Sequence, residues 1–423
     1  MLPQELLDAI IDTVASQKDG TTSLKNLSLV HREWAPRCRA HLFREVRLDR
    51  SSLYERGYSY PSSNSSRLQA FLELVKRAQF KSPASNVPTM AEGVRILGVE
   101  NNFSPLIPQA IGYLPQLHTL LVRTDLRSED EEVQDQLSGR VEESALRPQK
   151  PVKLKRLYIR QVRRWPRGTF NFVARCLQLQ DWNLEVDDID HPRPEGVGDT
   201  SSVKLRRLEL HNASDVLGLL LHMPHTRPVF ENLRHFTVTP FPDDTFEHPL
   251  SLLTSVRHSL EGFELNLGHI DKSALYQKIP EILDLSTFTS LTHLVLINYP
   301  RSADQPPFAL PQGITSLLSS YQHATASPLQ TLTLTISWNV WNLEADWDED
   351  GSWERTKRLV VDQDSTRLPA FCNLLSFRVR VSVHQYSKKA IADQSDVALR
   401  RAKELFDLGR EIEGGVTFNM FKM

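Results

Sequence analysis

The stretch Leu205-Arg206-Arg207-Leu208-Glu209-Leu210 decides how most of this chain folds. Leu208 and Leu210 are two residues apart, so they lie on one face of a short β-strand, because side chains alternate between the faces of a strand. Leu205 comes three residues earlier and anchors the turn that enters the strand. The polar side chains between these leucines then face mostly outward. The stretch therefore predicts a strand with one buried face.

The pattern of this stretch returns about ten times along the chain. The copies are Val94-Leu97-Val99, Leu117-Leu120-Val122, Leu154-Leu157-Ile159, Leu179-Trp182-Leu184, Leu205-Leu208-Leu210, Leu233-Phe236-Val238, Leu260-Phe263-Leu265, Leu291-Leu294-Leu296, Leu329-Leu332-Leu334 and Leu374-Phe377-Val379. Most starts are separated by roughly 23 to 31 residues. Amphipathic stretches suited to helices lie between copies, at residues 169–176, 215–223, 250–257, 272–285 and 314–323.

Strand followed by helix, repeated in this way, resembles irregular leucine-rich repeats. The resemblance implies an α/β fold in which residues 91–394 form a curved solenoid with a parallel sheet and outer helices. A conventional α/β domain with leucine-rich strands is the alternative. The common register of so many copies favours the solenoid.

The N-terminal residues predict three short helices. Pro3 suits the first turn of a helix, and Gly20 is predicted to stop that helix in a left-handed cap. The second helix is expected to start at Thr22 or Ser23, and the third runs to Phe43. Apolar residues recur on these helices at helical spacing: Leu6, Leu7, Ile10, Ile11 and Val14, then Leu24, Leu27, Val30 and Trp34. So few residues cannot bury these apolar faces alone, so a partner or the rest of the chain must cover them.

The order of these elements resembles an F-box of the form common in fungal proteins. The matching features are Leu2-Pro3 followed by Glu5-Leu6-Leu7, isoleucines one turn later, Ser28-Leu29-Val30 with Arg32 and Trp34, and a closing Leu42-Phe43. The resemblance implies docking onto the Skp-type adaptor of a cullin-RING ubiquitin ligase. The residues that would form or support the adaptor-facing surface are Leu2, Pro3, Leu6, Ile10, Ile11, Leu29, Val30 and Trp34. The alternative is that these side chains pack against the downstream repeats.

These features predict four parts: an F-box at residues 1–48, a linker with a connecting helix at 49–90, the solenoid at 91–394, and a C-terminal capping helix and tail at 395–423. The linker helix is expected from residue 68 to residue 78. An excursion between the last two copies is tryptophan-rich, which is typical of interface anchors. We therefore expect Trp338, Trp341, Trp347 and Trp353 to contribute to substrate binding, or else to form a small core of their own.

The composition limits the cellular compartments and the classes of binding partner that we expect for this protein. Fifty basic and 52 acidic residues give a net charge of −2, which disfavours nucleic acid and anionic membranes as partners. Three widely spaced cysteines fit a reducing compartment, where each is expected to be a small buried residue. Without a signal peptide or a long apolar run, the sequence predicts a soluble protein of the cytoplasm or nucleus.

Sequence signals for catalysis are weak. Asp346, Asp348 and Asp350-Gly351 match half of a calcium-binding loop, but Lys357 stands where the bidentate glutamate belongs. Glycine-rich phosphate loops and nucleophile elbows are missing from the sequence. We therefore expect no enzyme activity, no metal and no cofactor. The predicted function is a substrate receptor of an SCF-type ubiquitin ligase; a solenoid scaffold with an N-terminal helical cap is the alternative, and an enzyme with an unrecognised pocket is a distant third.

Overall fold

The structure is a computed structural model of the whole chain. It describes residues 3–31, 33–48, 64–79, 90–100, 106–123, 153–162, 176, 178–186, 203–222, 227–240, 246–267, 279, 282–298, 312–323, 327–339, 354–356, 371, 373–385 and 413–422. The chain divides into two compact units. Unit 1 comprises residues 1–205 and 223–229, and unit 2 comprises residues 206–222 and 230–423.

Unit 1 begins with three short helices, which we call the head: α1 (Gln4–Ser16), α2 (Gly20–Val30) and α3 (Ala35–Leu42). Pro3 precedes α1 in an extended conformation, and its carbonyl accepts hydrogen bonds from the N–H groups of Leu6 and Leu7 at 3.1 and 3.2 Å. Pro36 lies in the first turn of α3, where a missing N–H costs no helical hydrogen bond. Each proline therefore marks the start of a helix.

The predicted left-handed stop at Gly20 is wrong. α1 ends at Gln17, which is extended, and Gly20 is the first residue of α2. A Cβ at Gly20 would collide with the carbonyl oxygen of Val14 and lie 3.2 Å from that of Ala15. The glycine is therefore required because the start of α2 approaches the end of α1 closely, and not because of a positive φ.

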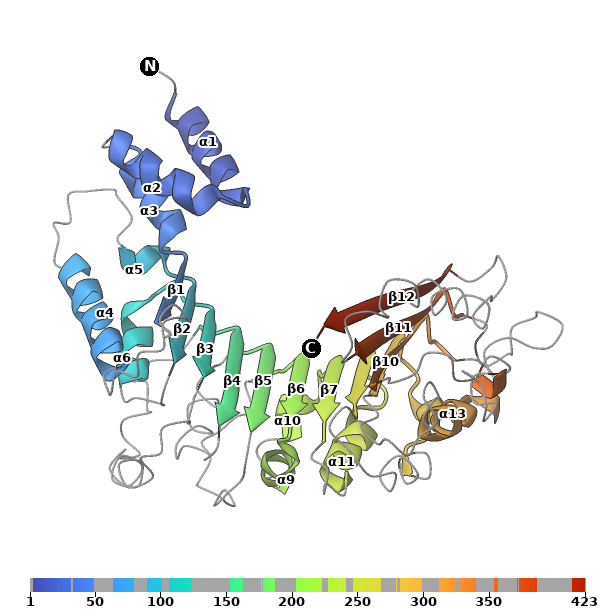
Figure 1. The fold of residues 1–423 in the computed structure, drawn as a ribbon. Helices are drawn as coiled ribbons and strands as arrows, with labels where there is room; N and C mark the ends of the chain where they lie inside the picture. Colours follow the sequence, from blue (N-terminus) through green and yellow to red (C-terminus); the bar gives the residue numbers. More distant parts are fainter. Residues whose placement is uncertain are drawn as a thin grey trace. The chain divides into compact units, whose positions relative to one another are not determined.

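Five parallel strands of unit 1 lie side by side in chain order (Figure 1): β1 (Glu45–Leu48), β2 (Ile96–Glu100), β3 (Thr119–Arg123), β4 (Arg156–Val162) and β5 (Asp181–Val186). The helices α4 (Asn64–Gln79) and α5 (Met90–Gly93) come before β2, and α6 (Leu106–Tyr113) comes before β3. The linker helix predicted from residue 68 to 78 corresponds to α4, and its four apolar positions are buried: Leu68, Phe71, Leu72 and Val75.

Unit 2 repeats this arrangement with parallel strands that again follow chain order: β6 (Arg207–His211), β7 (His235–Thr239), β8 (Gly262–Asn266), β9 (His293–Asn298), β10 (Thr331–Asn339), β11 (Ser376–Gln385) and β12 (Glu413–Lys422). Its α-helices are α9 (Ser214–His222), α11 (Glu247–Val256) and α13 (Gln312–Ser319); α10 (Arg227–Phe230) contributes residues to both units. Two short 3-10 helices are η2 (Leu285–Thr287) and η3 (Ser320–His323).

Three of the five helices predicted between copies match α9, α11 and α13 with η3. Most residues of the other two lie outside the described part of the chain.

The repeated apolar positions form the core of both units. Every anchor of all ten copies is buried, with at most 5% of its surface exposed. Within unit 1, Leu120 is in register with Leu97 on one side and with Leu157 on the other, and Leu157 is in turn in register with Trp182. Parallel strands in this register stack like side chains in rows, so each strand buries its apolar face against its neighbours. The predicted mixed α/β class with a parallel sheet is confirmed.

The first and last strands of the series were harder to predict from the sequence than the ten copies between them. Phe43, Val46 and Leu48 repeat the anchor spacing at β1, and all three are half-buried. The last residues form β12, which contains the glycine pair 414–415 and runs parallel to β11. Residues 395–412, predicted as a capping helix, lie outside the described residues. None of the helices in the described part of the chain is long and apolar enough to cross a membrane.

Candidate partner-binding site

The head has a small core of its own. Ile11, Leu24 and Cys38 are buried, one from each helix, and partly buried apolar side chains pack around them: Val14, Ala15, Leu27, Trp34 and Leu42. Cys38 lies in an apolar environment, and burial raises the pKa of its thiol. This thiol therefore behaves as a small apolar residue rather than as a nucleophile.

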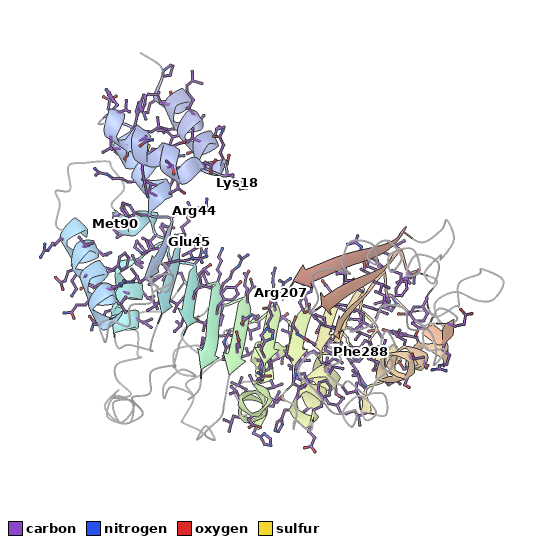
Figure 2. All side chains as sticks on the ribbon, viewed as in Figure 1. Lys18, Arg44, Glu45, Met90, Arg207 and Phe288 are labelled. Carbon is purple, nitrogen blue, oxygen red and sulfur yellow. The ribbon has the colours of Figure 1, made fainter. Side chains whose placement is uncertain are left out.

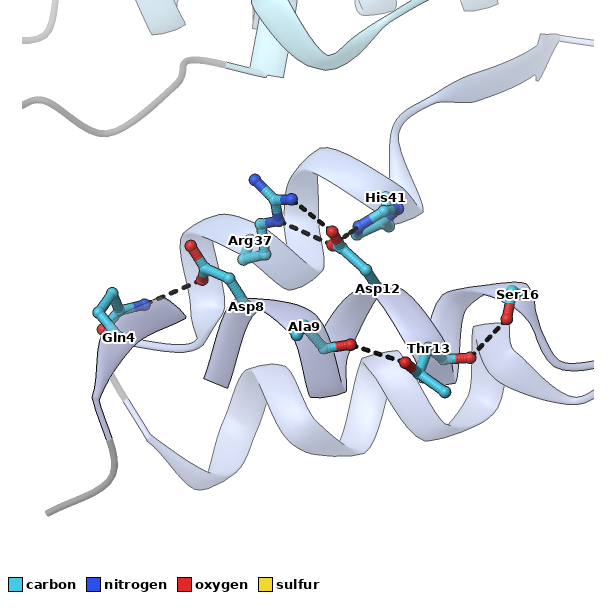
Figure 3. A network of polar contacts seen from close by, with 8 residues as sticks. All are labelled: Gln4, Asp8, Ala9, Asp12, Thr13, Ser16, Arg37 and His41. Carbon is cyan, nitrogen blue, oxygen red and sulfur yellow. Dashed lines mark hydrogen bonds and ion pairs between the residues drawn. The ribbon is translucent and has the colours of Figure 1, made fainter. Parts of the chain in front are cut away.

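A polar network fixes α3 against α1 beside this core (Figure 3). The carboxylate of Asp12 accepts two hydrogen bonds from the Arg37 guanidinium, at 2.9 Å from Nε and 2.6 Å from Nη2, and lies 2.7 Å from Nε2 of His41. The hydrogen bond from Arg37 holds the pKa of Asp12 down at about 2, against a partial burial that would raise it, and the contact with His41 adds to the lowering. The network therefore joins the two helices on a polar side of the head.

The other sides of α1 and α2 expose large apolar side chains. Leu6 and Ile10 lie one turn apart on α1, with 52% and 49% of their surfaces exposed, and Leu29 and Val30 end α2 with 85% and 68% exposed. We call these four residues the exposed apolar set. Fully burying one such side chain contributes about 1.5–3 kcal/mol, so this surface offers a partner considerable binding energy.

α3 and β1 connect the head to the rest of unit 1. A Cβ at Gly93 of α5 would lie 3.4 Å from Cα of Ala40, so α5 packs directly on α3. The carbonyl of Arg44 accepts hydrogen bonds from the N–H groups of Arg95 and Ile96 at 2.9 and 3.0 Å. The attachment therefore uses the side of the head formed by α3 and leaves the exposed apolar set uncovered.

The predicted adaptor-facing residues fall into three groups. Pro3 and the exposed apolar set lie on the surface. Ile11 is only 2% exposed and Trp34 is half-buried against the head core, so both support that surface from beneath. Leu2 lies outside the described residues.

The predicted substrate-binding tryptophans are not brought together by the described structure. Trp338 lies in β10, where its backbone is in register with Val383 of β11, and its side chain is outside the description. Trp341, Trp347 and Trp353 lie outside the described residues altogether, as do the aspartates of the half calcium loop. These residues stay predictions.

Reading the sequence motif by motif missed a row of basic residues at the start of the strands of unit 1. Arg44, Arg95, His118 and Lys155 each immediately precede a strand, and we call them the basic stripe. The signal was present in the repeats, because three of these residues directly follow the first anchor of a copy. Aligning the copies and reading down that column would have found it.

The described residues show little that resembles a catalytic or metal site. No group of three or more His, Cys, Asp or Glu side chains capable of holding a metal ion occurs among them. One gap in the core of unit 2 is lined by apolar side chains only, including Leu265, Leu296 and Leu317. The exposed apolar set and the basic stripe are therefore the features that point to partners.

Comparison with known proteins adds no relative from which function could be transferred. No family profile matches the chain, and no curated protein is significantly similar to it. The functional argument therefore rests on the residues of this chain.

Proposed function

We propose that this protein is a substrate-recognition subunit of an SCF-type cullin-RING ubiquitin ligase. In this proposal the head is an F-box that docks a Skp-type adaptor, and the strands with their helices form a curved, leucine-rich-repeat-like solenoid that binds a protein substrate. The protein would act in the cytoplasm or nucleus. The observation that carries the proposal is the exposed apolar set, whose four residues are 49–85% exposed on a head that is otherwise folded around its own core.

The proposal explains why a small head keeps large apolar side chains in water. Solvent-exposed leucines contribute little to the stability of the head, and contiguous exposed apolar surface, such as neighbouring Leu6 and Ile10 would form on α1, marks an interaction site. The same side chains contribute to binding when an adaptor covers them. An adaptor is thus the partner that gives these residues a physical role.

The repeats support the substrate-binding half of the proposal. Within each unit, neighbouring strands pair in register, which is the one-dimensional arrangement of repeat proteins. Such arrangements present long, continuous surfaces that suit protein ligands. The protein itself would make and break no covalent bond; it would raise the effective concentration of substrate lysines near the ubiquitin-charged enzyme by binding both on one scaffold.

A second candidate is a scaffold unrelated to ubiquitin, in which the head only caps the end of the repeats. The pairing of β1 with β2 and the close packing of α5 on Ala40 favour this candidate. A cap, however, works by covering apolar surface with its own, so Leu6 and Ile10 should be buried. Their exposure favours the adaptor proposal over the cap.

A titration of the purified chain with purified Skp adaptor tests the proposal. We expect direct binding, and we expect Leu6→Asp combined with Ile10→Asp to abolish it, because two charges would be placed in an apolar interface. Thr21→Asp with Thr22→Asp is the matched control: it adds the same charge in the first turn of α2, where acidic residues are favourable, and should leave binding unchanged.

Three outcomes would refute the proposal. They are no binding by the folded chain, undiminished binding by the Leu6 and Ile10 variant, and equal losses in the variant and the control. Circular dichroism of each variant checks that the head is folded.

A further inference from the structure

The basic stripe is a continuous ladder rather than a set of scattered surface charges. The His118 N–H donates to the Arg95 carbonyl at 3.0 Å, and the Lys155 N–H donates to the His118 carbonyl at 2.9 Å. The Arg95 N–H donates in the same way to Arg44, at the start of β1; Figure 2 labels Arg44 there. Since neighbouring strands are about 4.8 Å apart, four cationic or ionisable side chains stand side by side over roughly 14 Å.

Among the described residues, the three exposed basic side chains of this ladder form no ion pair. Arg44, Arg95 and Lys155 are exposed, and none of them forms an ion pair with a carboxylate within the described residues. Arg156, one residue after Lys155, is paired with Asp181 at 3.0 Å. Burial, and then the positive charges of Arg95, Arg156, Lys155 and Arg44, lower the pKa of His118. Arg44, Arg95 and Lys155 thus contribute three positive charges along the stripe.

The residues that immediately precede the strands of unit 2 are not consistently basic. It reads Arg206, Arg234, Glu261, Thr292, Gln330 and Leu375, and the guanidinium of Arg234 pairs with Glu261 at 2.8 Å. The repeat architecture thus does not require cations at this position. Like charges on adjacent strands are destabilising, so this row of basic residues in unit 1 has a cost that an anionic ligand would offset.

Apolar side chains follow the stripe positions along three strands. Ile96, Leu121 and Tyr158 are half-buried on the outward side of β2, β3 and β4, the side opposite the buried anchors. Gly98 lies among them, and the Arg47 side chain crosses it, with Cγ 3.3 Å from where a Cβ would stand. Ile96 directly follows Arg95, and Leu121 and Tyr158 each come three residues after the stripe position of their strand.

We infer that the basic stripe and the adjoining face of Ile96, Leu121 and Tyr158 bind an extended acidic peptide segment that carries several carboxylates and a large apolar side chain. An extended chain rises about 3.3 Å per residue, so four or five ligand residues span the stripe. Arginine forms paired hydrogen bonds with carboxylates. These bonds fix the orientation of the carboxylate and add to the charge complementarity. This inference rests on the proposed function in one respect, because it names the class of substrate segment that the receptor would recognise.

Nucleic acid fits this surface less well. The whole chain has a net charge of −2, and the stripe with its adjoining face offers one aromatic side chain, Tyr158, on which a base could stack. A short row of basic side chains near two aliphatic residues and a single tyrosine suits carboxylates combined with an apolar anchor. Nucleic acid is therefore the alternative that the experiment must exclude.

Fluorescence anisotropy with the full chain tests the inference. The probe is a short labelled peptide with glutamates on both sides of a central leucine. We expect it to bind, to bind more weakly as salt is added, and to lose at least about tenfold in affinity when Arg95→Glu and Lys155→Glu reverse the charge of the stripe. The matched control is Lys18→Glu with Lys25→Glu, which makes the same change in net charge at exposed positions of the head and should change the affinity less than about twofold.

The outcomes separate the possibilities. Equal losses in the stripe variant and the control, or equal binding of a peptide with glutamine in place of glutamate, would overturn the inference. So would an oligonucleotide of matched charge that binds more tightly than the peptide and depends on Arg95 and Lys155. If the charge reversal unfolds the chain, Arg95→Gln with Lys155→Gln should still weaken binding in the same direction. The assay contains no adaptor, so its failure leaves the F-box proposal standing, and the failure of adaptor binding leaves this result interpretable.

Discussion

The head and the strand repeats of unit 1 use the same residue types in opposite ways. In the repeats, leucine, isoleucine and valine anchors are at most 5% exposed, whereas the exposed apolar set of the head is 49–85% exposed. A strand in a series buries its apolar face against two neighbours, but a three-helix head has only enough interior for a few side chains. The difference teaches that apolar residues stabilise the repeats, whereas on the head they are available for binding.

The largest effect should come from removing a repeat anchor. Leu157 is 0% exposed and lies in register between Leu120 and Trp182. We expect Leu157→Ala to lower the free energy of unfolding of unit 1 by about 2–5 kcal/mol, because it leaves a cavity in a close-packed row. Denaturant unfolding measures the loss. A loss below about 0.5 kcal/mol would mean that the rows are not closely packed, and the contrast with the head would disappear.

The next effect tests how tightly the head itself is folded. A Cβ at Gly20 would collide with the backbone of Val14, which cannot move away as a side chain can. We expect Gly20→Ala to cost about 1–3 kcal/mol through overpacking. Gly112 of α6 is the control, because a Cβ there meets nothing within 4 Å, and Gly112→Ala should be neutral or stabilising by up to about 1 kcal/mol. Equal effects at the two glycines would show that α1 and α2 do not approach each other as described.

The sequence predicted the repeats better than the head, and the reason is physical. Burial of one strand face imposes a strict spacing on the chain, so the ten copies could be read directly and every anchor is buried as expected. The head depends on contacts between helices that spacing does not encode: the close approach at Gly20, and the ion pair between Asp12 and Arg37, which are far apart in sequence. The basic stripe was also missed, because it exists only when strands place distant residues side by side.

A smaller effect should follow acidification of the head. The folded-state pKa of Asp12 is about 2, below its ordinary value of 3.8. The carboxylate therefore contributes stability that is fully present above about pH 5 and is lost as pH falls towards 2. Because Asp12 and Arg37 are each 43% exposed, this contribution should be only about 0–1 kcal/mol.

Asp12→Asn should consequently be less stable than the parent at neutral pH, and the difference should shrink as the pH falls from about 5 to about 2. Thermal unfolding at a series of pH values measures this. Asp8→Asn is the control for the hydrogen bonds, since Asp8 lies on the same helix, accepts a hydrogen bond from Gln4 and acts on Arg37 through its charge. A constant difference between parent and Asp12→Asn across that pH range would contradict the assigned network.

The smallest effect on stability should come from truncating exposed apolar side chains of the head, although the same change should clearly weaken adaptor binding. Leu29 and Val30 are the most exposed members of the exposed apolar set, so Leu29→Ala with Val30→Ala should change the free energy of unfolding by no more than about 0.5 kcal/mol. If these side chains are held in water for a partner, the same variant should weaken adaptor binding about tenfold or more, because truncating interface anchors commonly costs more than 1 kcal/mol each. Stability and binding would then separate in the head, whereas in the repeats every change of an anchor lowers stability first. A variant that loses stability but keeps its affinity for the adaptor would reverse this comparison and favour the capping role of the head.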